Sequence, residues 1–195
     1  EKTPDRDARV REFLVQFAAA AFRRPLTEAE TQLFRETLFA DAPSPEAAVR
    51  RAVILVLTSP SFLYDDLTPA GEAPTQYAIA ARLALGLWDS VPDAALVDAA
   101  ANGRLASAEE IEAEARRMLD DPRAKAKLRA FFEHWLELDE RDLAKDQALF
   151  PEFDEAVVAD LRTSLELFVE DVVWSEASDY RELLLADYLV LNERL

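Results

Sequence analysis

The 195-residue sequence contains no cysteine and only one histidine. Without cysteine the chain can form no disulfide, thiolate zinc site, iron–sulfur cluster or Cys-x-x-Cys-His haem attachment. A single histidine, His134, also excludes the paired histidines of a His-x-x-x-His zinc site. The Glu-x-x-His pair of a di-iron bundle is missing too, because Phe131 stands three residues before His134. We therefore expect no cofactor on this chain.

Basic residues are scarce as well, with 22 Lys and Arg against 39 Asp and Glu and a net charge of −17. Phosphate-backbone binding depends on Lys and Arg, so the balance argues against nucleic acid as a partner and against an anionic membrane surface. No apolar run reaches the ~20 residues of a membrane helix, so we expect no membrane insertion. The charge fits solubility, or an acidic patch that meets a basic protein partner.

Only three glycines accompany many Ala, Leu, Glu and Arg, a composition that favours helix over sheet. We expect an all-α fold, an irregular or orthogonal bundle of seven to nine helices. Its centre is predicted at 74–90, where Arg82 is the only charge between Tyr77 and Trp88. A helix that is apolar nearly all round must be covered on most sides. Residues 188–191 are the one doubtful strand.

Cap signals divide the rest of the chain into helices. Thr27 with Glu30, and Ser107 with Glu110, have the spacing of capping boxes. Proline suits the first turn of a helix and stops one that precedes it. These signals predict helices over residues 5–22, 27–40, 45–58, 74–90, 94–102, 108–119, 122–138, 152–175 and a short one after Ser178.

The Pro/Gly-rich connection at 65–73 is the best candidate for an internal boundary. We expect a small N-terminal helical unit over 1–58 and a larger helical unit over 59–195. Glu1 opens on a polar stretch, and Leu195 directly follows an apolar one. We therefore expect a piece of a longer polypeptide, with the larger unit truncated at its C-terminal end.

Carboxylates are the only plentiful chemical groups, and a solvated acidic face is their usual role. Glu166 and Glu170 share one face of the predicted 152–175 helix and could act as general acid and base. His134 could act as a general base, although a hydrogen-bonding role at the edge of the core is more common. We assign no catalytic residue; Glu166, Glu170 and His134 are the candidates that an enzyme would use.

Two further kinds of site can be weighed. The acidic stretch 139–155 lacks the glycine and the alternate aspartates of a calcium hand, so we expect no metal there. Aromatic side chains could line a sugar-binding face, but their helical spacing favours the core. They are Phe62, Tyr77, Trp88, Trp135 and Trp174.

Several short strings resemble the planctomycete surface-domain family, consecutive helical domains of unknown function. Their order along the chain also resembles that of the family. The strings are Ala21–Thr27 (AFRRPLT), Ser59–Tyr64 (SPSFLY), Ala81–Leu83 (ARL), Leu87–Asp93 (LWDSVPD), Arg117–Arg123 (RMLDDPR), Trp135-Leu136, Phe150–Phe153 (FPEF) and Asp187–Leu195 (DYLVLNERL).

The resemblance implies a domain of a large exported protein, periplasmic or at the cell surface, associated with a c-type cytochrome domain. It implies no activity and no catalytic residues. His134 departs from the family, which commonly has Gln before the Trp-Leu pair. The leading interpretation is a non-catalytic interaction or scaffold module that contacts neighbouring domains. The alternatives are an enzyme domain acting on extracellular glycans through paired carboxylates, and a carbohydrate-binding module.

Overall fold

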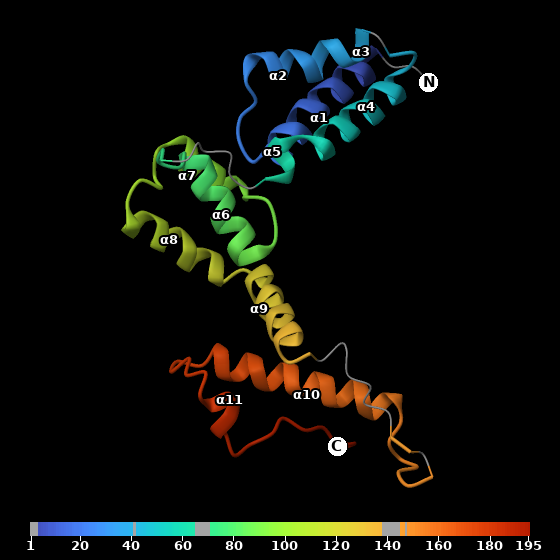
Figure 1. Ribbon diagram of the computed structural model, residues 1–195, viewed down its shortest axis with the longest axis vertical. Coiled ribbons are helices and arrows are strands. Elements are labelled where there is room, and N and C mark those ends of the chain that lie inside the picture. Colours follow the sequence, from blue (N-terminus) through green and yellow to red (C-terminus); the bar gives the residue numbers. More distant parts are fainter. Residues whose placement is uncertain (1–3, 41, 65–70, 138–144, 147) are drawn as a thin grey trace. The chain divides into compact units, whose positions relative to one another are not determined.

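A computed structural model describes residues 4–40, 42–64, 71–137, 145–146 and 148–195, and every regular element within them is helical (Figure 1). The predicted all-α class is thereby confirmed. The described residues form ten helices when α2, η1 and α3, which follow one another without a break, are counted as one. The one not predicted is α5 (Pro60–Leu63), which begins at the cap Ser59. Residues 188–191 form no strand.

Contacts group the chain into two compact units, Glu1–Asp120 and Asp121–Leu195, called unit 1 and unit 2. Each is described by itself. The division into 1–58 and 59–195 stays a prediction.

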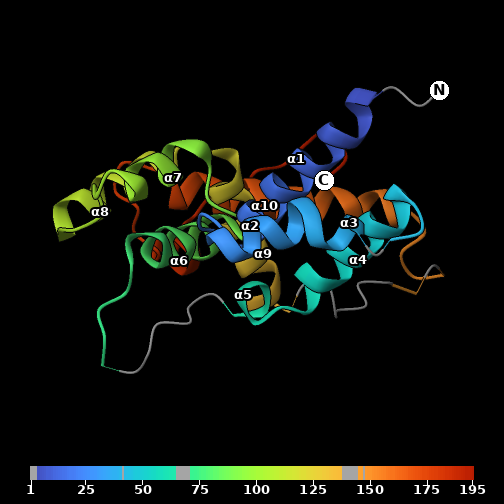
Figure 2. The same ribbon diagram turned by 90° about the horizontal axis from the view of Figure 1, so that it is seen from above.

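Six helical segments form the first part of unit 1. Here α1 packs against η1 and α4, and α3 also packs against α4 (Figures 1 and 2). The bounds are α1 Pro4–Phe22, α2 Glu28–Gln32, η1 Leu33–Thr37, α3 Leu38–Ala40, α4 Pro45–Thr58 and α5 Pro60–Leu63. Side chains on the facing stripes of these helices make the core: Leu14, Ala18, Ala21, Phe22, Phe34, Ala52 and Val56.

The second part of unit 1 is built on α6 (Gln76–Trp88), which packs against α7 (Ala94–Ala101) and α8 (Ala108–Leu119). The predicted helix is confirmed, and Trp88 is 4% exposed. Its indole Nε1 donates a hydrogen bond to the Met118 carbonyl at 2.9 Å, which ties α6 to α8.

Burial of α6 is less complete than the sequence predicts. The fully enclosed stripe consists of Trp88 and three alanines, whereas the larger apolar residues of the helix are half-buried. Alanine allows close approach of neighbouring helices, so the contact face is narrow. The stripe contains Ala80, Ala81, Ala84 and Trp88, and the half-buried residues are Tyr77, Ile79, Leu83, Leu85 and Leu87.

Unit 2 contains α9 (Pro122–Trp135), α10 (Glu155–Val173) and the short α11 (Glu182–Leu185). Its helices are shorter than the predicted 122–138 and 152–175, because Asp154 caps α10 and the backbone of Leu136 leaves the helical region. The pairs α9–α10 and α10–α11 are in contact. Residues 186–195, here called the strap, have no regular structure apart from a turn. No described helix is long and apolar enough to span a bilayer.

Candidate functional site

The two candidate carboxylates lie together on α10 and share one cation on α9. Arg129 Nη2 donates to Glu170 Oε1 at 2.5 Å, and Arg129 Nε lies 3.7 Å from Glu166 Oε2. The hydrogen bond with Glu170 raises the pKa of Arg129 above its ordinary value. The arrangement fastens α9 to α10. Sequence reasoning missed Arg129 as the counter-ion because its partners lie about forty residues away along the chain.

A small cavity of about 20 Å³ lies beside this ion-pair cluster, between α9 and α10. Its lining combines the side chains of the ion-pair cluster with apolar side chains. The apolar ones include Phe132, Leu165, Val169 and Trp174. Such a volume holds about one water molecule, whereas pockets for small ligands measure roughly 300–1,000 Å³. A sugar ring therefore does not fit between the helices here.

His134 is exposed in the last turn of α9, and it is not among the residues that line this cavity. The structure thus brings Glu166 and Glu170 together but does not add His134 to them. A catalytic role for any of the three stays a prediction. Glycosidase carboxylates flank the scissile bond from two sides, whereas these two project from one helix face toward one guanidinium.

Arg23 has a structural role that the sequence did not indicate. Arg23 is only 8% exposed, and its backbone φ of 57° lies in the left-handed region. Arg23 Nη2 donates to the carbonyls of Ser61, Phe62 and Tyr64 at 3.1, 3.3 and 2.7 Å. These carbonyls end α5, where a helix lacks internal donors. One buried guanidinium therefore caps a helix about forty residues away.

Arg24 and Glu30 form a second part of the same motif. The guanidinium of Arg24 donates to both Glu30 oxygens, at 2.9 and 2.8 Å. Glu30 also accepts from the Thr27 backbone N–H at 2.8 Å, which completes the predicted capping box. The Arg24 hydrogen bond is the main reason that the pKa of Glu30 falls to about 2. The AFRRPLT string thus holds the start of α2 to the end of α1.

Residues of two other strings that carry the resemblance, LWDSVPD and RMLDDPR, also make structural contacts. Asp93 caps α7 through Leu96 N–H at 2.8 Å and pairs with Arg117 Nη1 at 2.9 Å. Asp121 caps α9 by accepting from Arg123 N–H at 2.9 Å. With Trp88 on Met118, these contacts set how the helices turn and join.

The strap lies along α10 in the opposite direction, as the red trace beside α10 in Figure 1 shows. The Tyr188 hydroxyl donates to Asp171 Oδ2 at 2.7 Å, and the ring of Tyr188 meets Phe168 edge-on at 5.5 Å. The hydrogen bond with Asp171 raises the pKa of Tyr188 above its ordinary value. Further along, Ser164 Oγ donates to the Val190 carbonyl, and Arg194 lies 3.3 Å from Asp160.

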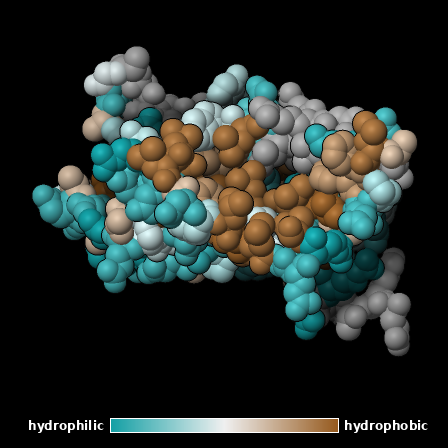
Figure 3. Space-filling view, turned by 90° about the horizontal axis from the view of Figure 1, so that it is seen from below, coloured by the Kyte–Doolittle hydropathy of each residue, from teal (hydrophilic) through white to brown (hydrophobic). Residues whose placement is uncertain are grey.

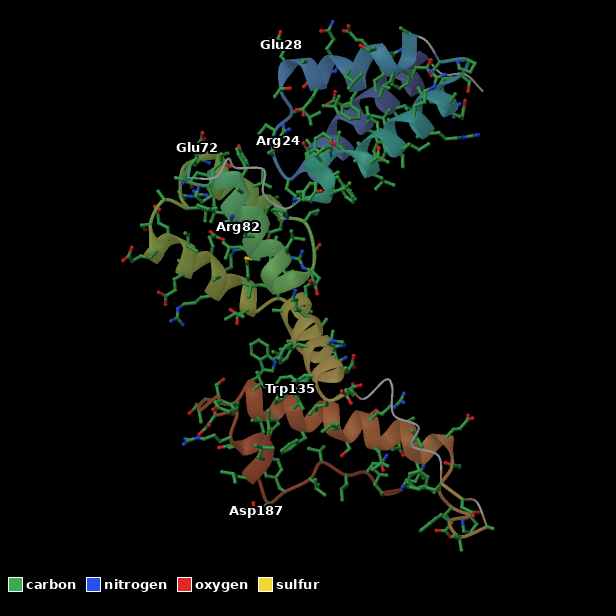
Figure 4. The ribbon with its side chains drawn as sticks, in the orientation of Figure 1. Arg24, Glu28, Glu72, Arg82, Trp135 and Asp187 are labelled. Carbon is green, nitrogen blue, oxygen red and sulfur yellow. The ribbon has the colours of Figure 1, made fainter. Side chains whose placement is uncertain are left out.

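Unit 2 has a thin core and a large exposed apolar surface. Among its described residues only Ala124, Phe132, Val169 and Val172 are buried hydrophobics. Figure 3 looks onto the α11 side, where brown atoms spread across the face, and Figure 4 shows Asp187 at the bend after α11. Thirteen large hydrophobic residues in the described part of unit 2 are exposed: Phe131, Trp135, Leu149, Phe150, Leu161, Leu167, Trp174, Tyr180, Leu184, Leu185, Tyr188, Leu189 and Leu191.

A wider hollow of about 510 Å³ opens where the end of the strap meets the start of α10. Phe150, Phe153 and Leu161 line it together with Arg194 and Leu195. Its lining is mixed, since Glu152 and Arg194 stand beside the apolar side chains.

Metal-binding groups are not assembled in the part of the chain that the structure describes, where no three or more His, Asp or Glu side chains could hold an ion. The stretch 139–155, considered for calcium, lies partly outside the described residues, Asp142 included.

Two family models match the chain. The model described as PSD4, protein of unknown function (DUF1592), matches residues 75–195. The model described as PSD5, protein of unknown function (DUF1595), matches residues 9–65. The first covers more than half of the sequence, and the chain therefore belongs to the DUF1592 family. No curated protein and no solved structure matches it.

These matches confirm part of the resemblance, namely two consecutive domains of unknown function. The change from one family model to the next falls between residues 65 and 75, in the Pro/Gly-rich connection.

Proposed function

We propose that this chain is a non-catalytic helical interaction module of a larger exported protein. The observation that carries the proposal is the imbalance between core and surface in unit 2. Its described part has four buried hydrophobic residues, whereas thirteen large hydrophobic residues are exposed. Extended apolar surface on a small unit marks a place where another protein surface docks. The ordered ion pairs of the family strings fit a scaffold, since they join helices.

The partners in this proposal are neighbouring domains of the parent polypeptide and, through the acidic surface, a basic protein. The resemblance to planctomycete surface domains supports an exported parent, periplasmic or at the cell surface. It also supports a c-type cytochrome domain among the neighbours. The net charge of −17 favours a partner with basic residues at its surface.

The proposal is tested on α11. Leu184 and Leu185 are 86% and 77% exposed, so Leu184→Glu with Leu185→Glu should leave the fold intact. Binding of the chain to the rest of its parent polypeptide, added separately, is measured by calorimetry. We expect this double variant to weaken binding by about tenfold or more, because the glutamates would be desolvated in the interface.

A matched control carries the same chemical change on unit 1. Ile54 and Leu57 of α4 are 63% and 46% exposed, and Ile54→Glu with Leu57→Glu should bind like the wild type. Equal binding by both double variants, or no binding by the wild type, would contradict the proposal. An absorbance spectrum of the whole parent tests the cytochrome association, since a bound haem gives a strong Soret band.

A carbohydrate-binding module is the second candidate, because two aromatic side chains of α9 are exposed and parallel. Phe131 and Trp135 are 55% and 61% exposed, with ring centroids 6.1 Å apart and planes at 18°. Figure 4 labels Trp135. Exposed aromatic rings can stack on sugars. Affinity electrophoresis in gels that contain soluble glycans tests this: retardation that Trp135→Ala abolishes would support the second candidate.

The glycan-enzyme alternative draws on Glu166 and Glu170, which do line a cavity with Trp174. The cavity of about 20 Å³ and the shared Arg129 favour a clamp between helices instead. Release of reducing sugar by the chain, lost in Glu170→Gln, would support the enzyme.

A further inference from the structure

The strap leaves backbone hydrogen-bonding groups without partners inside the described part of the chain. The backbone N–H groups of residues 187–191 donate to no protein atom there, and of their carbonyls only that of Val190 accepts a hydrogen bond, from Ser164. A row of free N–H and C=O groups on an extended segment is a template for another strand.

The side chains of the strap alternate between two sides. Val190 is half-buried, whereas Leu189 and Leu191 are 73% and 56% exposed. In an extended chain, neighbouring residues also direct their backbone groups to opposite edges. Since the Val190 carbonyl accepts from Ser164 on one edge, the N–H groups of Leu189 and Leu191 are expected on the opposite edge.

The segment that contains α10, α11 and the strap is strongly acidic. Residues 155–195 contain ten Asp and Glu against three Arg. Two of these arginines are already paired, Arg181 with Asp179 at 2.5 Å and Arg194 with Asp160 at 3.3 Å. A second copy of the chain would bring like charge to the edge, and a basic segment would bring the opposite charge.

We propose that residues 187–191 bind an extended segment of a partner by β-strand addition, and that this segment alternates basic and apolar residues. The partner backbone pairs with the free edge of the strap, its apolar side chains cover Leu189 and Leu191, and its basic side chains meet the surrounding carboxylates. Affinity from main-chain pairing with specificity from alternate side chains is the usual division in this recognition mode. The inference rests on the proposed interaction function.

The test uses the full 195-residue chain, ¹⁵N-labelled, and a ten-residue probe peptide of alternating lysine and valine. A peptide of alternating glutamate and valine is the matched control. We expect the lysine peptide to bind at least about tenfold more tightly. It should slow amide exchange of Leu189 and Leu191 by at least about tenfold, with little change at Val190, whose amide faces α10.

Two variants separate backbone from side-chain effects. Leu189→Pro removes one N–H from the free edge and suits an extended conformation, so it should abolish binding of the lysine peptide. Leu189→Ala keeps the N–H and should retain most of the binding. An unchanged Phe168–Tyr188 contact, seen as preserved ring-proton shifts, shows that Leu189→Pro leaves the strap in place.

Each other outcome overturns the strand-addition proposal. These are binding of both peptides alike, binding without protection of Leu189 and Leu191, and a dimer of the chain that protects these amides without peptide. Failure of both peptides overturns it as well. The interaction function is then judged separately by the α11 double variant, whose binding partner is the parent polypeptide.

Discussion

Replacement of the buried Arg23 tests how far the AFRRPLT string serves folding. Arg23→Met keeps the bulk of the side chain but removes the donors to the carbonyls of Ser61, Phe62 and Tyr64. Loss of a hydrogen bond to a charged group costs ~1.5–3 kcal/mol. The three acceptors share Nη2, so their contributions do not add, and we expect a total of ~3–5 kcal/mol.

This loss is large for unit 1. A unit of this size has a stability of roughly 6–18 kcal/mol at typical values per residue. The midpoint of thermal unfolding should fall by roughly 10–20 °C. Arg23→Gly should be at least as harmful as Arg23→Met, because relief of strain at the φ of 57°, about 1 kcal/mol, is offset by the cavity that loss of the buried side chain leaves.

The assay is far-UV circular dichroism during heating and in urea, with the two Arg23 variants compared with Arg6→Met. Arg6 lies on α1, which ends one residue before Arg23, and makes an exposed ion pair with Glu46, so its loss should hardly move the midpoint. Unfolding of Arg23→Met at the same urea concentration as Arg6→Met would show that the Arg23 hydrogen bonds do not stabilise unit 1.

Three further changes test other contacts. Trp88→Phe removes the indole donor to the Met118 carbonyl at the end of α8, which keeps the backbone N–H of Asp120, and should lower the free energy of unfolding in urea by ~0.5–1.5 kcal/mol. An unchanged free energy of unfolding would show that this bond does not contribute. Glu30→Gln should cost about 1–2 kcal/mol at pH 7 after allowance for solvent screening. Because folding lowers the pKa of Glu30 to about 2, this stabilisation is complete above the ordinary value of 4.5 and is lost as the pH falls toward 2, so wild type and variant should converge there. Arg129→Met leaves Glu166 and Glu170 without their shared cation and should lower the stability of unit 2 by about 1 kcal/mol at low salt. Trp174 fluorescence during urea unfolding reports this loss of stability, and adding Glu170→Gln to Arg129→Met should partly restore it. An unchanged unfolding midpoint in Arg129→Met would show that the ion pairs do not stabilise unit 2.

Local signals predicted the helices well because each depends on a few adjacent residues. Thr27 with Glu30 and Ser107 with Glu110 form the capping boxes that their spacing indicates. The burial of Trp88 also follows from its apolar surroundings in the sequence. The error in the number of helices came from α5, where one turn between Ser59 and Tyr64 carries no periodicity to detect.

Long-range polar contacts could not be predicted, because nothing in the local pattern identifies the partner. Arg23 and Arg24 follow directly after α1, yet Arg23 caps α5 and Arg24 binds the carboxylate of Glu30. The pairing of Glu166 and Glu170 on one face followed from helical spacing. Their common partner Arg129 and the small volume beside them required the tertiary structure.

Footprinting of the apolar face of unit 2 tests the interaction function most directly. Carbene labelling of Leu184, Leu185 and Leu189 is compared between the isolated chain and the intact parent polypeptide. We expect strong labelling in the isolated chain, where these side chains are exposed, and at least about tenfold less in the parent. Equal labelling in both would show that no partner surface covers this face and would contradict the account.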